Sequence, residues 1–187
     1  MLTDDERAFL ARATRTMQII VGALAWGVIL FFLVVVFFLR QQQPGPLPGE
    51  PILTYISGFA GLAAMLGAIV VPGMIIRGQR KDMLGGKLPP DAGAGGATRT
   101  DAERELGPIV ASYQTALIVR SALVEGAAFF CLVAYMLEGQ TLSLFAAGVL
   151  LAFLLRGIPT KSRVEDAVEF ERTTIKQLRP LESIDAR

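Results

Sequence analysis

The sequence contains no histidine and only one cysteine among its 187 residues. Histidine is the usual general base and a frequent metal ligand. Its absence removes Ser/His/Asp and Cys/His catalytic sets, HExxH zinc sites and His-ligated haem. Cys131 lies inside an apolar run and has no second cysteine to pair with, so we expect it to be a packing residue. These absences predict a protein that is not an enzyme and that holds no cofactor and no metal ion.

An excess of charge of either sign is also missing. The chain has 18 basic and 17 acidic residues, and its net charge of +1 indicates neither a nucleic-acid partner nor an acidic tail. Apolar residues, in contrast, make up 52% of the chain. A soluble domain of this length could not bury so much apolar surface, so we expect the chain to lie in a lipid bilayer.

Four apolar runs follow one another along the chain. A helix needs about 20 apolar residues to cross a hydrocarbon core of about 30 Å. Residues 17–39, 52–76 and 109–137 meet that length, and the shorter run 141–156 ends in Arg156, whose long side chain reaches the interface. The first run is too long for the apolar region of a signal peptide. The sequence therefore predicts an all-α integral membrane protein with four transmembrane helices.

Basic residues indicate the orientation of these spans. The segments between and beyond them are 1–16, 40–51, 77–108, 138–140 and 157–187. All Lys and Arg of these segments fall in the first, third and last, except Arg40. Because loops rich in Lys and Arg stay in the cytoplasm, we expect both termini there and the protein in the plasma or inner membrane.

Three capping-box patterns mark helix starts on the cytoplasmic side, at Thr3–Glu6, Thr100–Glu103 and Ser162–Glu165. The first predicts a helix over residues 1–16 that runs into the first span. The third opens a cytoplasmic amphipathic C-terminal helix that should end near Leu178, before Pro180. That helix has three readings: it lies on anionic lipid, it docks a partner or a second copy, or it packs on its own bundle.

The loop 77–108 is rich in glycine and proline and predicts a flexible linker. A glycine-rich loop can bind phosphate. No Gly-Lys-Ser/Thr follows the glycines here and no strand precedes them, so nucleotide binding is not indicated.

Small residues mark the expected contacts between spans, since helices in lipid associate where their backbones approach closely. The second span carries the clearest stripe, made of Ser57, Gly61, Ala64 and Ala68. On the third span, Ala122 and Gly126 form a small-xxx-small motif, which is a further site where another helix can approach. The connector 138–140 is so short that the third and fourth spans should be antiparallel neighbours. Pro72 is expected to kink the second span.

The third span carries polar residues that packing alone does not explain: Arg120, Ser121 and Glu125. If the hydrocarbon begins near Leu117, Arg120 lies about 5 Å deep and can reach the interface, whereas Glu125 lies about 12 Å deep and cannot. Five residues place the two charges about 140° apart around the helix, which disfavours a bridge between them. Ser121 shares the face of Glu125, whose ionic partner should come from another helix or chain.

Residues 115–126, Thr-Ala-Leu-Ile-Val-x-x-Ala-Leu-Val-Glu-Gly, resemble the carboxylate-bearing helix of the ATP synthase c subunit, the proteolipid of the rotary proton channel. The second span, the cytoplasmic loop and the third span are similar in order and direction to that family's hairpin. The resemblance implies a proton or ion site at Glu125. The long loop, the two flanking spans and Arg120 depart from the family.

Two functions follow from these features. The first is a non-enzymatic subunit or scaffold of a membrane complex, with a protein partner or a second copy of the chain, in which Glu125 fixes helix register or joins subunits. The alternative is proton or cation translocation through Glu125. A membrane-embedded enzyme ranks third, because Arg120, Glu125 and Tyr113 include no nucleophile or metal set.

Overall fold

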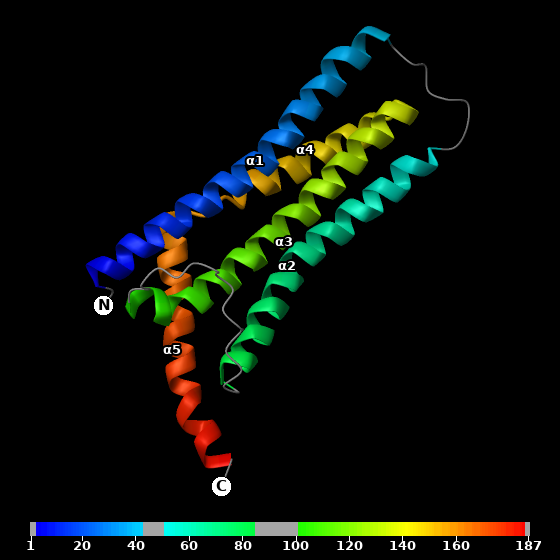
Figure 1. Cartoon of the computed structure of the whole chain (residues 1–187). Coiled ribbons are helices and arrows are strands. Elements are labelled where there is room, and N and C mark those ends of the chain that lie inside the picture. Colours follow the sequence, from blue (N-terminus) through cyan, green and yellow to red (C-terminus); the bar gives the residue numbers. More distant parts are fainter. Residues whose placement is uncertain (1–2, 43–50, 85–100, 186–187) are drawn as a thin grey trace. The chain divides into compact units, whose positions relative to one another are not determined.

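A computed structural model describes residues 3–42, 51–84 and 101–185, which form five α-helices and no strand (Figure 1). The helices are α1 (Asp4–Gln42), α2 (Ile52–Leu84), α3 (Asp101–Glu138), α4 (Thr141–Arg156) and α5 (Lys161–Asp185). The prediction of an all-α fold is confirmed.

Three of these helices, α1, α2 and α3, contain stretches long and apolar enough to cross a membrane. Helix α4 has 16 residues and rises about 24 Å at 1.5 Å per residue. A fourth crossing of full length is reached only if α4 and the first part of α5 count as one broken span. Apolar helices of this length are typical of a membrane protein.

The start of α1 has the predicted capping box. The Thr3 amide donates to the Glu6 carboxylate at 2.7 Å, and the Glu6 amide donates to the Thr3 hydroxyl at 3.3 Å. The helix then continues without a break to Gln42. The second box begins at Thr100, which lies outside the described residues. The third box begins at Ser162, but α5 already begins at Lys161. Its first turn is closed by a hydrogen bond from the Val164 amide to the Thr160 carbonyl.

Helix α2 extends further than the sequence predicted, because it continues to Leu84 and so enters the expected loop 77–108. Helix α3 begins at Asp101, where the second capping box predicted a helix start, and residues 85–100 lie outside the described part. The end predicted for α5 before Pro180 is wrong, because the helix continues to Asp185. A proline removes one backbone donor, and the hydrogen bonds on either side carry the helix across it.

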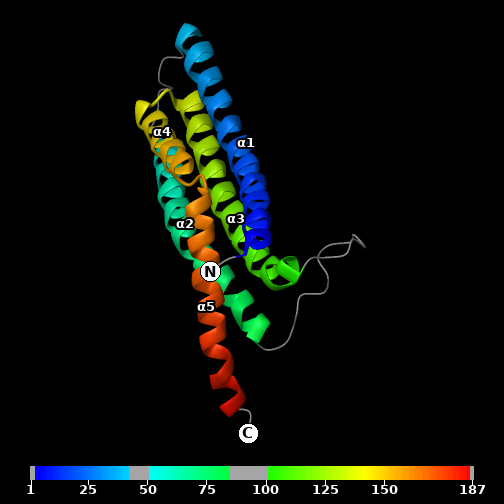
Figure 2. The ribbon, with the colours of Figure 1, turned by 90° about the vertical axis from the view of Figure 1, so that its left-hand side faces the viewer.

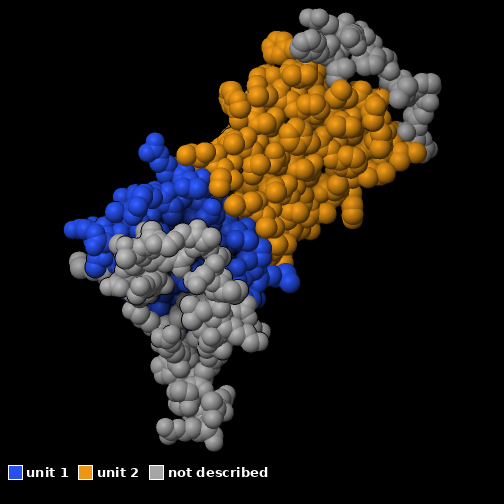
Figure 3. Space-filling view, in the orientation of Figure 1, with its two compact units in different colours: residues 1–18, 72–117, 159–187 blue, residues 19–71, 118–158 orange. Residues whose placement is uncertain are grey.

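The helices form two compact units (Figure 3). Unit 1 comprises residues 1–18, 72–117 and 159–187, and unit 2 comprises residues 19–71 and 118–158. The first three helices contribute to both.

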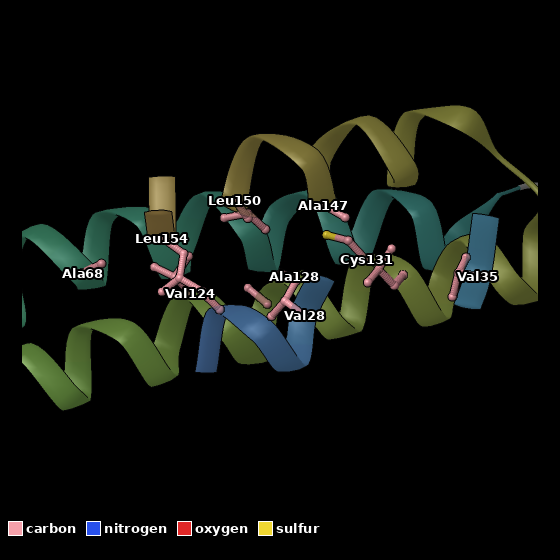
Figure 4. Close-up of a cluster of buried hydrophobic side chains, with 12 residues drawn as sticks. Val28, Val35, Ala68, Val124, Ala128, Cys131, Ala147, Leu150 and Leu154 are labelled. Carbon is pink, nitrogen blue, oxygen red and sulfur yellow. The ribbon is translucent and has the colours of Figure 1, made fainter. Parts of the chain in front are cut away.

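In unit 2, α3 lies between α1 and α2 (Figure 1, Figure 2). Its buried side chains include Val124, Ala128 and Cys131, which pack with residues of the other three helices such as Val28 and Leu150 (Figure 4). Among the side chains described in this unit only four are charged, namely Arg120, Glu125, Glu138 and Arg156. Three of the four belong to α3, so this helix carries most of the charge of the apolar unit.

In unit 1, α5 is held by polar contacts at its sides. Arg80 of α2 makes two hydrogen bonds to the Glu171 carboxylate, at 2.6 and 3.1 Å. Arg172 lies 3.2 Å from the carboxylate of Glu6. The apolar residues Val164 and Val168 of α5 are fully buried. These contacts favour the reading in which α5 packs on its own bundle.

Candidate functional site

Glu125 of α3 faces a glycine of α1. Its Oε1 atom lies 3.8 Å from the position that a Cβ atom would take at Gly27, and the Phe129 ring lies 3.9 Å from the same point. Both distances are ordinary van der Waals contacts, so the carboxyl group lies directly against the backbone of α1 at Gly27. Among the described residues Glu125 makes no hydrogen bond and no ion pair. It is half-buried, and Ser121, one turn before it, is buried.

The side chain of Arg120 points toward α4 and not toward Glu125. Its guanidinium carbon lies 5.0 Å from the centroid of the Phe153 ring, a cation–π contact. One of its terminal nitrogens lies 3.9 Å from the position that a Cβ atom would take at Gly157, which ends α4. The structure thus gives the predicted site residues Arg120 and Glu125 different neighbours, consistent with their angular separation along the helix.

The small residues of α2 lie at its contact with the other helices of unit 2. Ser57 is fully buried, and its carbonyl accepts a hydrogen bond from the Cys131 thiol at 3.5 Å. A Cβ atom at Gly61 would lie 3.4 Å from a methyl carbon of Leu150. Ala68 is buried, and Ala64 packs against the apolar cluster. All four residues therefore face the rest of the unit.

Gly126 does not follow this pattern. It is exposed at the surface of unit 2, and a Cβ atom there would meet nothing within 4 Å. Ala122, one turn earlier, is also exposed. The packing predicted at Gly126 has no partner in the described part of the chain, because this face of α3 points away from the other helices of the unit.

Sequence reasoning missed a polar cluster around Glu138, the last residue of α3. Its carboxylate accepts hydrogen bonds from the amides of Leu53 and Thr54, both at 2.7 Å, and from the Thr54 hydroxyl at 2.6 Å. The Ser143 hydroxyl of α4 donates to the Thr54 hydroxyl at 3.0 Å. This Glu138 cluster joins the start of α2, the end of α3 and the start of α4.

A signal for this cluster was present in the sequence. Helix α2 begins at Ile52, directly after Pro51, whose side chain has no acceptor to cap the free amides of the first turn. An acidic residue from another helix can supply the acceptor, and Glu138 was expected at the same end of the bundle.

Unit 1 contains a pocket of about 200 Å³ between α2, α3 and α5. It is lined by Ile76, Ile109, Ser112, Tyr113, Ala167, Val168, Phe170 and Glu171. Its walls are mostly apolar, and the carboxylate of Glu171 is already paired with Arg80.

No family model, curated protein or solved structure matches the chain. The resemblance of residues 115–126 to the ATP synthase c subunit therefore stays a prediction. Chemically, the site around Glu125 offers one carboxyl group that can hold a proton or pair with a group from outside the chain.

Proposed function

We propose that the chain is a membrane protein of four spans with both termini in the cytoplasm, acting as a non-enzymatic subunit or scaffold of a membrane complex. The spacing of its charges supports the spans. Arg120 and Glu138 are 18 residues apart on α3, which corresponds to a rise of about 27 Å. That rise is close to the thickness of the hydrocarbon core, about 30 Å.

The contacts of α4 support a fourth crossing. Its first turn touches the Glu138 cluster through Ser143, and its last turn touches Arg120 through Phe153. The chain reverses between α3 and α4 at Gly139, whose φ of 67° suits glycine. Helix α4 therefore accompanies α3 from Glu138 to Arg120, and a bilayer crossed by that part of α3 is also crossed by α4.

The single observation that carries the role as a subunit is the unpartnered carboxyl group of Glu125 among the described residues. A carboxyl group inside an apolar unit is costly unless it is protonated or hydrogen-bonded. Beside it on α3, Ala122 and Gly126 are exposed at small-xxx-small spacing, which permits close approach of another helix. A partner helix on this face would bring its backbone close and supply a polar group to Glu125.

Disulfide cross-linking in native membranes tests this role. In a Cys131→Ser background we introduce Gly126→Cys on the open face of α3 and, as the control, Leu66→Cys on the exposed surface of α2. We expect oxidation to link Gly126→Cys to a second copy, or a bifunctional thiol reagent to link it to a specific partner, and to leave Leu66→Cys unlinked. A monomer in mild detergent with equal, background linking at both positions would contradict the proposal.

The second candidate, proton or cation translocation, is favoured by the position of Glu125 against Gly27, a carboxyl group in an apolar setting with no ionic partner in the described chain. It predicts pH-dependent reaction of Glu125 with a hydrophobic carbodiimide. It also predicts that Glu125→Gln abolishes ion flux in proteoliposomes, whereas Ser121→Ala retains it. Unaltered flux in Glu125→Gln would rule this candidate out.

A further inference from the structure

Arg120 is a cation without a counter-charge in the described chain. A guanidinium group has five N–H donors and stays charged at all physiological pH values. The structure gives Arg120 one contact of its charge, with the face of Phe153, and no hydrogen bond or ion pair among the described residues. The side chain is half-buried.

The other charges of unit 2 do not neutralise it. The acidic residues described in this unit are Glu125 and Glu138, which follow Arg120 by five and eighteen positions on the same helix. Glu125 faces Gly27 of α1, and Glu138 is occupied by Leu53 and Thr54. The group that balances Arg120 must therefore come from outside this unit's described side chains.

The location of Arg120 limits what that group is. Its guanidinium lies beside the last turn of α4, at Phe153 and Gly157, with Arg156 between them in the sequence. In the topology proposed above, on which this inference rests, that end of α4 is the cytoplasmic boundary of the hydrocarbon. Phospholipid headgroups occupy this level, and the cytoplasmic leaflet carries anionic lipids.

We propose that Arg120 binds the phosphate of an anionic phospholipid in the cytoplasmic leaflet. Phe153 makes a cation–π contact with the guanidinium. The guanidinium makes no hydrogen bond to the described residues, so its N–H groups can make a bidentate contact with two phosphate oxygens. A lipid without a compensating choline group keeps its full negative charge beside Arg120. Exposed Arg156, at the end of the same helix, adds to the positive potential there.

Thermal unfolding of the full chain in neutral detergent, with added phosphatidylglycerol or phosphatidylcholine, tests the site. We expect phosphatidylglycerol to raise the midpoint of the wild type well above the value in phosphatidylcholine. Arg120→Gln should lose this difference. Arg120→Lys keeps the charge without the planar fork of donors, and its midpoint should rise less with phosphatidylglycerol than that of the wild type. The control Arg15→Gln removes an exposed charge of unit 1 and should respond like the wild type.

Three outcomes would overturn the proposal: equal midpoints of the wild type in the two lipids, an undiminished response in Arg120→Lys and Arg120→Gln, or the same stabilisation from inorganic phosphate. The last would show an anion site that does not select lipid. Alkaline carbonate extraction of the membranes separates this failure from that of the proposed function. A chain that stays in the membrane but ignores phosphatidylglycerol contradicts only the lipid site.

Discussion

The carboxylate of Glu138 at the end of α3 accepts a hydrogen bond from the hydroxyl of Thr54 at 2.6 Å, across 84 positions of the sequence. The same carboxylate accepts the amides of Leu53 and Thr54 and so caps the first turn of α2 from a neighbouring helix. A negative charge at a helix N-terminus is favourable because the helix dipole is positive there. Glu138 thus replaces the cap that α2 lacks in its own sequence.

Removal of this carboxylate should destabilise the end of the bundle. We expect Glu138→Ala to lower the midpoint of thermal unfolding in detergent by about 5 °C, because it leaves two amides and a hydroxyl without their acceptor. Glu138→Gln retains one acceptor oxygen, so its unfolding midpoint should lie between those of the wild type and Glu138→Ala. The control is Gln140→Ala, since Gln140 precedes α4 without a capping hydrogen bond from its side chain. Equal midpoints for Glu138→Ala and Gln140→Ala would contradict the role of the Glu138 cluster.

The contact of α2 with the other helices should be sensitive to side-chain size at Gly61. A Cβ atom there lies 3.4 Å from Leu150, so Gly61→Leu overpacks the contact and should cost about 1–3 kcal/mol. Gly58, one turn earlier, has nothing within 4 Å of its Cβ position. Gly58→Leu should therefore be tolerated. Chemical denaturation of the two variants in detergent compares their free energies of unfolding. A larger loss of stability in Gly58→Leu than in Gly61→Leu would contradict a helix contact at Gly61.

The ion pair between Arg80 and Glu171 should stabilise the packing of α5 against α2 within unit 1. Its side chains are 24% and 16% exposed, and its two hydrogen bonds hold a fixed geometry. We expect Arg80→Gln to cost about 1–2 kcal/mol. The pair between Lys161 and Glu165 is longer, at 3.8 Å, and more exposed, so Lys161→Gln should cost less than about 0.5 kcal/mol.

Loss of this ion pair should let α5 detach from the other helices of unit 1. Limited proteolysis at the end of α5 detects the detachment, since a detached helix is cut faster. Faster cutting should appear in Arg80→Gln and be reversed in the exchanged pair Arg80→Glu with Glu171→Arg. If the exchanged pair is cut as fast as the single variant, the ion pair is not what holds α5.

The stability of unit 1 should depend on pH through Glu6. A hydrogen bond from the Thr3 amide holds the pKa of the Glu6 carboxyl below its ordinary value of 4.5, burial works against this, and Arg172 lowers the pKa further. Because the folded state favours the carboxylate, its stabilisation is complete above pH 4.5 and is lost as the pH falls below 4.5 through the folded value.

Melting curves from about pH 6 to about pH 3 test this dependence. Glu6→Gln should flatten the fall in midpoint seen in the wild type. Asp5→Asn, a change at an exposed neighbour, should leave it in place. A wild-type slope that survives in Glu6→Gln would assign the acid sensitivity to another carboxyl group.

The sequence was most informative where structure depends on neighbours along the chain. The capping box of Thr3 and Glu6 involves residues three apart, and apolar runs of sufficient length indicate helices by themselves. The all-α fold and the first helix start were predicted for these reasons.

Contacts between helices were less predictable. An apolar helix carries little polar pattern to show which way it is rotated, so Gly126 was expected at a contact and lies on the open face instead. The pairing of Glu138 with Thr54 depends on a rotation and a register between helices that only the folded bundle sets. Arg120 likewise finds Phe153 on α4, a neighbour that no spacing along α3 indicates.

The most direct test of the four-span topology is the labelling of single cysteines with a thiol reagent that does not cross the membrane. In a Cys131→Ser background, Asp4→Cys precedes the first span, Gln140→Cys lies between α3 and α4, and Arg163→Cys follows α4. We predict that Gln140→Cys is labelled in intact cells, and that Asp4→Cys and Arg163→Cys are labelled only after the membrane is permeabilised. Labelling of Arg163→Cys in intact cells together with Gln140→Cys would show that α4 does not cross the membrane and would contradict the four-span topology.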